Sequence, residues 1–216
     1  MPELSHCPLC GEFDLPHFHR DRRREYRRCQ ACGLVVVPPK YYLDSALERA
    51  EYDKHQNNPE DAGYRCFLSR LAEPLLARIA PASSGLDFGC GPGPVLAQIL
   101  EEAGHRMALY DINYHREKSV LEHDYDFICA TEVVEHLHRP REELQMLWKI
   151  IREKGYLAIM TKLVQDLPAF ERWHYKNDPT HVCFFSRDTW RWWARCYGAQ
   201  IEFFGSDVVL FRKPGG

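Results

Sequence analysis

The stretch Gly85-Leu86-Asp87-Phe88-Gly89-Cys90-Gly91-Pro92-Gly93 decides the fold of this chain. It reads as a short strand that enters a glycine-rich turn, and apolar residues from Val95 to Ala103 then recur at helical spacing. A second strand over 106–110 leads to Asp111. Strand, glycine turn, helix, strand and acid form the first half of a doubly wound α/β fold that binds nucleotides.

The glycine turn suits a bound ligand because residues without a Cβ let the backbone approach it closely. The helix that follows offers free backbone amides. A carboxylate at the tip of the next strand can accept both hydroxyls of a ribose, and Asp111 lies near the ~20-residue spacing expected of such an acid. A glycine turn alone is weak evidence, since a tight turn without a ligand also explains it.

Further motifs give the turn a specific context. The pattern G-x-G-x-G after Asp87 resembles motif I of the class I methyltransferases. Residues 125–137 contain D-x-I and then E-x-x-E-H, which is similar to that family's fourth strand and loop. The segments 199–204 and 208–211 look like its C-terminal antiparallel hairpin. The resemblance spans residues 64–213 and implies a Rossmann-like sheet, an enzyme, and S-adenosylmethionine as methyl donor. It also implies donor contacts at Asp87, Phe88, Gly89, Cys90, Gly91, Gly93, Asp111, Ile112, Thr131 and Glu132.

The chain departs from the family pattern after Asp111. The segment up to Asp126 is short for the usual helix, third strand and adenine-contacting acid, which leaves His123 and Asp124 as candidates for that contact. Further along, we expect the helix that begins at Pro140 to end at Gly155, before a fifth strand over 156–161.

Methyl transfer is an in-line displacement governed by positioning, with a base only where the nucleophile carries a proton. Glu135 and His136 follow the fourth strand at its carboxyl end, where open α/β sheets place ligands. His181 belongs to an insertion after the fifth strand, residues 170–186, which resembles the D-P-x-H-x-x-F-F/Y-S stretch of an E-x-x-E-H subgroup. Glu135, His136 and His181 are therefore the candidate catalytic residues, although His136 fits a helix-entry role equally well. The aromatic residues of this insertion either wall an acceptor pocket or belong to the core: Trp173, Tyr175 and Phe184.

Four cysteines near the N-terminus form two C-x2-C pairs separated by eighteen residues: Cys7, Cys10, Cys29 and Cys32. Two thiolates three positions apart can turn around one ion, and the glycine after each pair relaxes the backbone. Four such ligands complete a tetrahedron with no open position, so the spacing predicts a structural zinc ribbon. An iron site and a redox dithiol are the alternatives.

The segment Arg20 to Arg28 between the two pairs holds six arginines in nine positions. Guanidinium groups match phosphate and carboxylate, so this segment is a candidate docking surface for RNA or another macromolecule. A solvated hairpin face is the simpler explanation. Because the net charge is -3, we favour a small-molecule acceptor over RNA. A non-catalytic scaffold that binds the cofactor is a third hypothesis.

The chain of 216 residues is 45% hydrophobic and 27% charged, which is ordinary for one globular domain with a small accessory module. No stretch approaches the roughly 20 apolar residues of a membrane span, and the first residues do not resemble a signal peptide. We therefore expect a cytoplasmic protein without membrane contact. Pro38-Pro39 marks a boundary, which predicts a zinc ribbon over 1–38, a bridging helix or linker over 39–63, and a methyltransferase domain over 64–216. The sequence indicates no particular oligomeric state.

Overall fold

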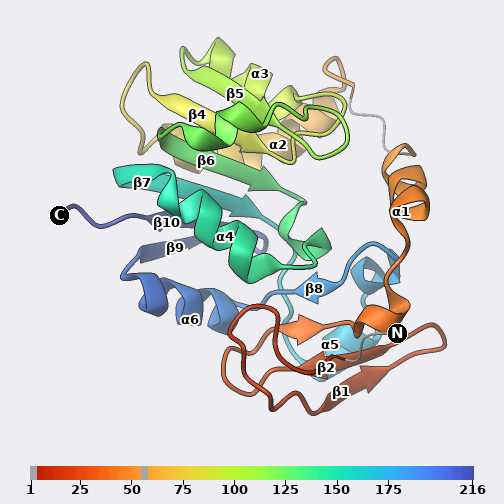
Figure 1. Ribbon diagram of the computed structural model, residues 1–216. Helices are drawn as coiled ribbons and strands as arrows, with labels where there is room; N and C mark the ends of the chain where they lie inside the picture. Colours follow the sequence, from red (N-terminus) through yellow and green to blue (C-terminus); the bar gives the residue numbers. More distant parts are fainter. Residues whose placement is uncertain (1–3, 55–57) are drawn as a thin grey trace.

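The computed structural model describes residues 4–54 and 58–216, and their strands form two sheets (Figure 1). The larger sheet has the order β5-β4-β6-β7-β10-β9, and the smaller sheet has the order β1-β2-β3-β8. The strands of the larger sheet are β4 (Ser84–Phe88), β5 (Arg106–Tyr110), β6 (Tyr125–Thr131), β7 (Ile151–Met160), β9 (Gln200–Phe204) and β10 (Val208–Arg212).

The larger sheet is mixed, as the sequence predicts. β4 pairs in parallel with β5 and β6, and β6 pairs in parallel with β7. β10 is antiparallel to both β7 and β9, so the expected C-terminal hairpin is confirmed. The chain runs from β4 outward to β5 and then returns to the other side of β4 to form β6. This reversal is the point at which open α/β sheets bind ligands, beyond the carboxyl ends of the strands.

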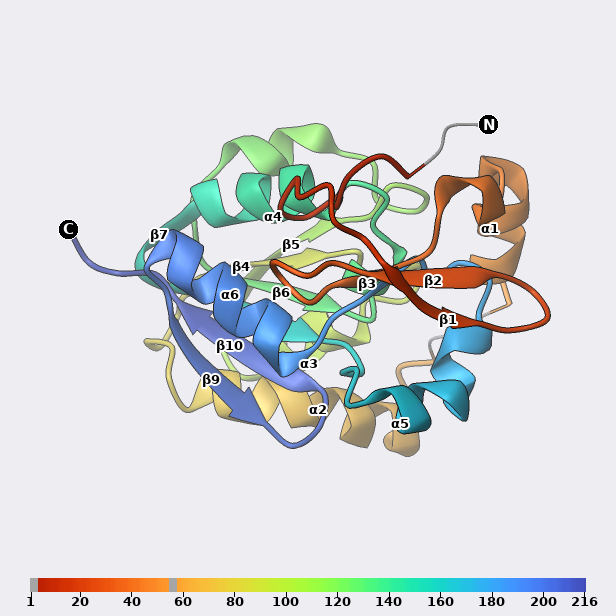
Figure 2. The same cartoon turned by 90° about the horizontal axis from the view of Figure 1, so that it is seen from below.

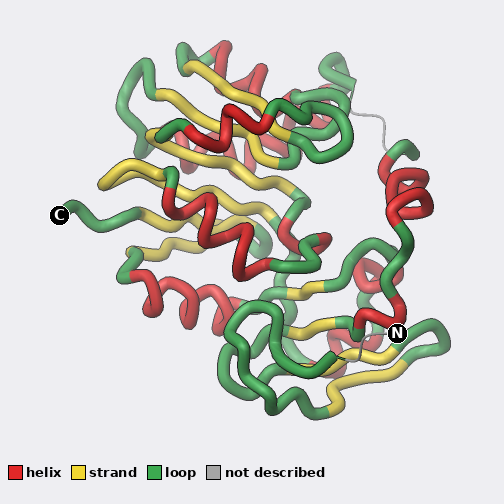
Figure 3. Tube along the Cα trace, viewed as in Figure 1, coloured by secondary structure: helices red, strands yellow, loops and turns green. Residues whose placement is uncertain are grey.

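Helices cover both faces of this sheet because each strand alternates its side chains between two cores. Phe127 and Cys129 of β6 pack with α2 (Ala62–Leu76) and α3 (Val95–Glu102), whereas Ile128 and Ala130 face the other core. That second core contains α4 (Pro140–Lys149) and α6 (Arg187–Tyr197). Figures 2 and 3 show the helices on either side of the strands. The doubly wound fold is therefore confirmed.

Two local details differ from the sequence-based picture. Between β5 and β6 the chain forms only the 3-10 helix η2 (Lys118–Glu122), so β5 is an edge strand, as the short segment allows. The expectation that α4 runs to Gly155 is wrong, because the helix ends at Lys149 and Gly155 lies inside β7. A Cβ at Gly155 would come 2.6 Å from the carbonyl oxygen of Asp126, so a close approach of two strands requires this glycine.

The N-terminal segment forms the smaller sheet together with a strand from much later in the chain. β3 (Val35–Val36) pairs with β8 (Cys183–Phe184) through Val35 and Phe184, and through Val36 and Cys183. The ribbon therefore shares a sheet and a hydrophobic core with the larger unit. The other elements are β1 (His17–Arg20), β2 (Glu25–Arg28), η1 (Pro39–Tyr41), α1 (Ser45–Tyr52), η3 (Val134–His136), α5 (Leu167–Glu171) and η4 (His174–Asn177). Within the described ranges, no helix has the length and apolarity that crossing a bilayer requires.

Candidate functional site

The glycine turn after β4 adopts the backbone conformation that its composition predicts. Gly89 and Gly91 have φ values of 75° and 66°, in the left-handed region that favours glycine. The amide of Gly89 donates to the carbonyl oxygen of Tyr110, 2.7 Å away, which ties the turn to the end of β5. A Cβ at Gly89 would come 2.4 Å from Cγ2 of Val133, so the turns after β4 and β6 lie against each other.

Asp111 closes this turn from the neighbouring strand. Its Oδ2 accepts from the amide of Gly91 at 3.1 Å, and its Oδ1 accepts from the amides of Asn113 and Tyr114 at 2.7 and 3.0 Å. Asp87 is 3% exposed, and its pKa is raised to about 7 by burial and by the charge of Asp111. The acid expected to hold a ribose therefore also organises the glycine turn.

The other residues predicted to contact the donor cluster at the same edge. Phe88 and Cys90 are buried beside the turn, and the buried Oγ1 of Thr131 at the end of β6 has no hydrogen-bond partner. Ile112 is 72% exposed beyond β5 and is available to cover a bound group. Gly93 accepts from the amide of Val95 at the start of α3. The structure brings these residues together, and their contact with a donor stays a prediction.

Two carboxylates meet at the end of β6. Glu132 has a φ of 52°, which is uncommon for a residue with a side chain, and Glu135 is fully buried. The hydroxyl of Tyr175 lies 3.1 Å from Oε2 of Glu132 and also hydrogen-bonds Oε1 of Glu135. The other oxygen of each carboxylate, Oε1 of Glu132 and Oε2 of Glu135, is buried without a partner. Burial raises the pKa of Glu132 to about 7, and burial together with the charge of Glu132 raises that of Glu135 to about 8.

Two histidines complete this cluster. The rings of His136 and His181 lie 4.6 Å apart, edge to face. Nδ1 of His181 is 2.8 Å from the carbonyl oxygen of Tyr175, and Nδ1 of His136 is 3.3 Å from that of Thr180. A carbonyl oxygen only accepts, so both Nδ1 atoms donate in these contacts. Nε2 of His181 lies 3.8 Å from Oδ2 of Asp178. Burial lowers the pKa of His181 to about 4, which keeps its ring neutral near pH 7.

The three residues predicted to be catalytic therefore come together although His181 is far from the other two in sequence. One side-chain atom from each of Glu135, His136 and His181 lies within 4.8 Å of the others, which is close enough to share a ligand or a metal ion. Sequence reasoning placed Tyr175 either in the wall of a pocket or in the core, whereas its hydroxyl joins the two carboxylates. Its place six residues before His181 is the only signal for this role.

The insertion that carries Tyr175 and His181 packs against the ribbon. Phe170 and Phe184 are each 1% exposed and contact the ring of Tyr26. The aromatic residues of the insertion thus contribute to a core that joins ribbon and domain. Val182 donates its amide to the carbonyl oxygen of Glu135, 2.8 Å away, and accepts from the amide of Val37 in the ribbon at 2.9 Å. A short backbone path therefore links the ribbon to the cluster.

Most arginines of the predicted docking segment already have partners within the protein. Arg24 is 6% exposed and donates to three backbone carbonyl groups of the insertion. Arg23 donates to the carbonyl oxygen of Asn177, and Arg27 to that of Leu15. The guanidinium of Arg28 lies over the ring of Phe18. The exposed Arg20 and Arg22 remain at the surface.

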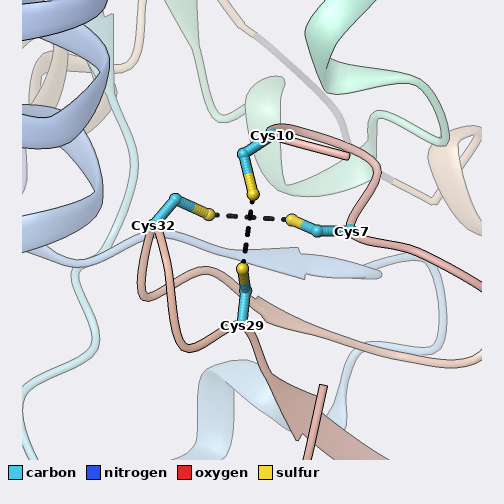
Figure 4. A group of neighbouring side chains, drawn as sticks. All are labelled: Cys7, Cys10, Cys29 and Cys32. Atoms are coloured by element: carbon cyan, nitrogen blue, oxygen red, sulfur yellow. Dashed lines mark hydrogen bonds between the residues drawn. The ribbon is translucent and has the colours of Figure 1, made fainter. Parts of the chain in front are cut away.

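The four predicted metal ligands point toward one centre (Figure 4). The sulfur atoms of Cys7 and Cys32 are 3.6 Å apart, and those of Cys10 and Cys29 are 3.3 Å apart. Zinc–sulfur bonds of about 2.3 Å in a tetrahedron require sulfur atoms roughly 3.8 Å apart, so the cage fits zinc with a small expansion. The glycines that follow the two pairs both have positive φ, as the motif predicts: Gly11 (83°) and Gly33 (76°).

Two surface hollows lie away from this cluster. One, of about 210 Å³, is lined by Asp126, Lys154 and Tyr156, at the edge where β6 begins rather than where it ends. The other, of about 310 Å³, lies between the ribbon and the helices α4 and α6 and includes Cys10, Arg141 and Trp193. The chemistry is concentrated at the carboxyl edge of the larger sheet, so neither hollow belongs to the candidate site.

Comparisons with known proteins agree with this geometry. A family model described as a methyltransferase domain matches residues 60–202. The chain is 16% identical to the 1,6-didemethyltoxoflavin-N1-methyltransferase of Burkholderia thailandensis, solved with 1,6-didemethyltoxoflavin and S-adenosylhomocysteine, with a TM-score of 0.58 over 92% of this chain and 99% of that chain. It is 15% identical to the magnesium protoporphyrin IX methyltransferase of Synechocystis, with a TM-score of 0.50 over 81% and 97% of the two chains. No curated protein matches the chain significantly. The family match spans about two thirds of the sequence, and the structural likeness concerns the fold.

Proposed function

Because the chain belongs to the methyltransferase domain family, we propose that it transfers the methyl group of S-adenosylmethionine to a small-molecule acceptor. The observation that carries this proposal is that two groups of residues lie together at one edge of the larger sheet. The glycine turn with Asp111 lies after β4 and β5, and the cluster of Glu132, Glu135, His136 and His181 lies after β6. The glycine turn with Asp111 would bind the donor, and the cluster after β6 would bind the acceptor.

The donor would bind over the glycine turn. Asp111 would accept from the ribose hydroxyls, and the backbone of Gly89 and Gly91 would approach the methionine part of the molecule, since neither has a Cβ. The exposed side chain of Ile112 would cover the adenine. The sulfonium is already activated, so the protein needs only to align it with the acceptor and keep water away.

The acceptor would lie between the end of β6 and the insertion. Glu132 and Glu135 have raised pKa values, and a carboxylate whose pKa lies near the working pH is suited to remove a proton from a nucleophile. Oε1 of Glu132 is an unpartnered buried oxygen and is free to accept that proton. His181 would stay neutral and orient the acceptor.

The arginine contacts favour a small acceptor over RNA. Four of the six arginines in the segment 20–28 bind carbonyl oxygens or a ring within the protein: Arg23, Arg24, Arg27 and Arg28. A phosphate-binding surface needs guanidinium groups that face solvent. We propose that the ribbon holds structural zinc through Cys7, Cys10, Cys29 and Cys32 and supports the insertion that carries His181.

Calorimetry with S-adenosylhomocysteine on zinc-loaded protein tests the donor half of this proposal. We expect saturable binding that weakens by at least tenfold in Asp111→Ala, which loses a charge-assisted contact worth ~1.5–3 kcal/mol. Asp188→Ala is the matched control, because Asp188 is an exposed acid in the first turn of α6 and is not among the residues predicted to contact the donor. Absence of binding to the wild-type protein would refute the proposal.

Label transfer tests the acceptor half. Protein incubated with methyl-labelled donor and cell extract should place the label in the small-molecule fraction. Label in RNA would select the macromolecular alternative. Donor binding with no transfer to any fraction would select the scaffold.

A further inference from the structure

Lys162 is a partly buried cation at the edge of the larger sheet where the candidate site lies. It follows β7 by two residues, at the carboxyl end of that strand. Its Nζ lies 5.2 Å from the centre of the Tyr175 ring, and the hydroxyl of the same tyrosine contacts both Glu132 and Glu135. The ammonium group and the two carboxyl groups therefore lie around one aromatic side chain.

The charge of Lys162 acts on the cluster without forming an ion pair. Burial raises the pKa of Glu132, and the ammonium of Lys162 is one of the groups that counteract this rise. Burial lowers the pKa of His181, and the same ammonium lowers it further. Within residues 4–54 and 58–216, however, no carboxylate forms an ion pair with Lys162. This cation is close to the cluster and has no acid of its own.

Two other cations, Arg70 and Arg24, act on the cluster but are engaged elsewhere. The guanidinium of Arg70 pairs with Asp207 at 2.8 Å. Arg24 donates to three carbonyl groups of the insertion. Of these three cations, Lys162 is the one whose donors are still available to a bound molecule.

His174 holds the ammonium group in place. Nζ of Lys162 lies 3.2 Å from Nε2 of His174, and since an ammonium only donates, this nitrogen accepts. It is the one hydrogen bond that Lys162 makes in the part of the chain that the structure describes, although an ammonium has three N–H groups. His174 is exposed, and the ring of the preceding Trp173 lies 5.0 Å from that of Tyr175. The remaining donors therefore lie where the cluster meets solvent, beside aromatic rings.

We propose that Lys162, held by His174, binds a carboxylate or phosphate group of the acceptor, so that the protein methylates a small organic acid at a separate group that carries a proton. This inference rests on the proposed function, since it names the class of its acceptor. An ammonium is a compact point charge that binds either anionic group. The anion would supply the counter-charge that Lys162 lacks and would hold one end of the acceptor beside Glu132.

The anionic group takes no part in the transfer and stays in the product. The nucleophile gives its proton to the unpartnered Oε1 of Glu132 and its lone pair to the methyl carbon. The bond between sulfur and the methyl carbon breaks with its electron pair left on sulfur, which gives the neutral demethylated donor. The product is therefore a methylated acid that still carries negative charge near neutral pH.

The charge of the product tests this inference on the wild-type protein. The protein is incubated with methyl-labelled S-adenosylmethionine and the small-molecule filtrate of a cell extract, in which it is the only enzyme. We expect the label that leaves the donor to be retained on an anion-exchange resin near neutral pH and to be eluted by salt. Treatment with alkaline phosphatase separates the two anionic groups, because it abolishes retention only where the charge belongs to a phosphate.

Variants at the two ends of β7 test the role of Lys162. In Lys162→Gln, half-saturation should need at least about tenfold more of the anionic fraction of the filtrate, because a charge-assisted contact is lost. Lys162→Arg keeps the charge and should restore most of the affinity. Lys149→Gln is the matched control and should behave as the wild-type protein, because Lys149 is exposed and lies two residues before β7, at the opposite end of the strand. Calorimetry with S-adenosylhomocysteine checks the donor site of each variant.

The outcomes separate this inference from the function on which it rests. Label in a neutral or cationic product would overturn the inference and leave the proposed function standing. The same holds for an anionic product whose half-saturation is equal in Lys162→Gln and the wild-type protein. Absence of donor binding, or of transfer to any acceptor, would instead refute the proposed function and the inference with it.

Discussion

Replacement of Arg24 tests whether the ribbon supports the candidate site. This buried guanidinium donates to the carbonyl oxygens of Lys176, Asp178 and Pro179 at 2.6, 2.7 and 3.2 Å. The three carbonyl groups belong to the turn between Tyr175 and His181, so one arginine of the ribbon holds the segment that positions both. Arg24→Ala would leave this turn without its main tether.

The expected loss of stability follows from these three contacts. A hydrogen bond from a charged donor contributes about 1.5–3 kcal/mol, but three bonds from one group are not additive, and water would enter the truncated site. We therefore expect Arg24→Ala to lower the free energy of unfolding by about 3 kcal/mol. Arg23 is exposed and donates to a single carbonyl oxygen, that of Asn177 at 2.9 Å. Arg23→Ala should cost no more than about 0.5 kcal/mol.

Urea unfolding of zinc-loaded protein measures both variants. Hydrogen exchange of residues 175–182 then separates a local effect from a global one, since these amides should exchange at least about tenfold faster in Arg24→Ala at denaturant-free conditions. Arg24→Lys keeps the charge but loses the several N–H donors of the guanidinium group, so its free energy of unfolding should lie between those of the wild-type protein and Arg24→Ala. Equal losses in the two alanine variants, or unchanged exchange in this segment, would show that Arg24 does not hold the turn.

Three further outcomes follow from the same contacts. The pKa of Asp21 is lowered to about 2, because the amides of Arg24 and Arg23 and the hydroxyl of Tyr26 outweigh burial. The stabilisation by the Asp21 carboxylate is therefore complete above pH ~4 and is lost as the pH falls through about 2. This pH dependence of the free energy of unfolding should be absent in Asp21→Asn when unfolding is measured across the same range. Gly89→Ala should destabilise the protein by at least about 1 kcal/mol more than Gly104→Ala. Both glycines have positive φ, but only at Gly89 would the added Cβ collide with a neighbouring side chain. Calorimetry should also show weaker donor binding in Gly89→Ala. A strong chelator, which would remove the zinc proposed for the four cysteines, should speed hydrogen exchange of β8, since this strand pairs with β3. Unchanged exchange in β8 would show that the four cysteines do not support the candidate site.

The parts of the fold that the sequence predicts are those specified by local chemistry. The glycine turn, the strand before it and Asp111 lie close together in the chain, and their residue types allow few alternatives. Both strands of the hairpin 200–212 are rich in β-branched and aromatic residues, and a glycine lies in the turn between them. The short segment after Asp111 indicates a departure from the family pattern, and the structure accordingly has no strand beyond β5 at this edge of the larger sheet.

The features that sequence reasoning missed depend on contacts between distant residues. A strand is predicted at 34–37, where β3 lies, but its partner β8 is two residues long and far along the chain, so no sequence pattern indicates that the two would pair. Gly155 looked like a helix end, since its requirement for close strand packing involves Asp126, a residue on another strand. Arg24 looked like part of a solvated run because its carbonyl partners lie about 150 positions away.

The pairing of β3 with β8 gives the ribbon a role that its cysteines alone do not suggest. His181 lies two residues before β8 and is held on one side by the turn that Arg24 binds. On the other side, Val182 is hydrogen-bonded to both Val37 of the ribbon and Glu135 of the cluster. We therefore expect a shift of the ribbon to move His181 relative to Glu135, and a functional site tolerates errors of only about 0.5 Å. The ribbon would then act on the candidate site through the backbone.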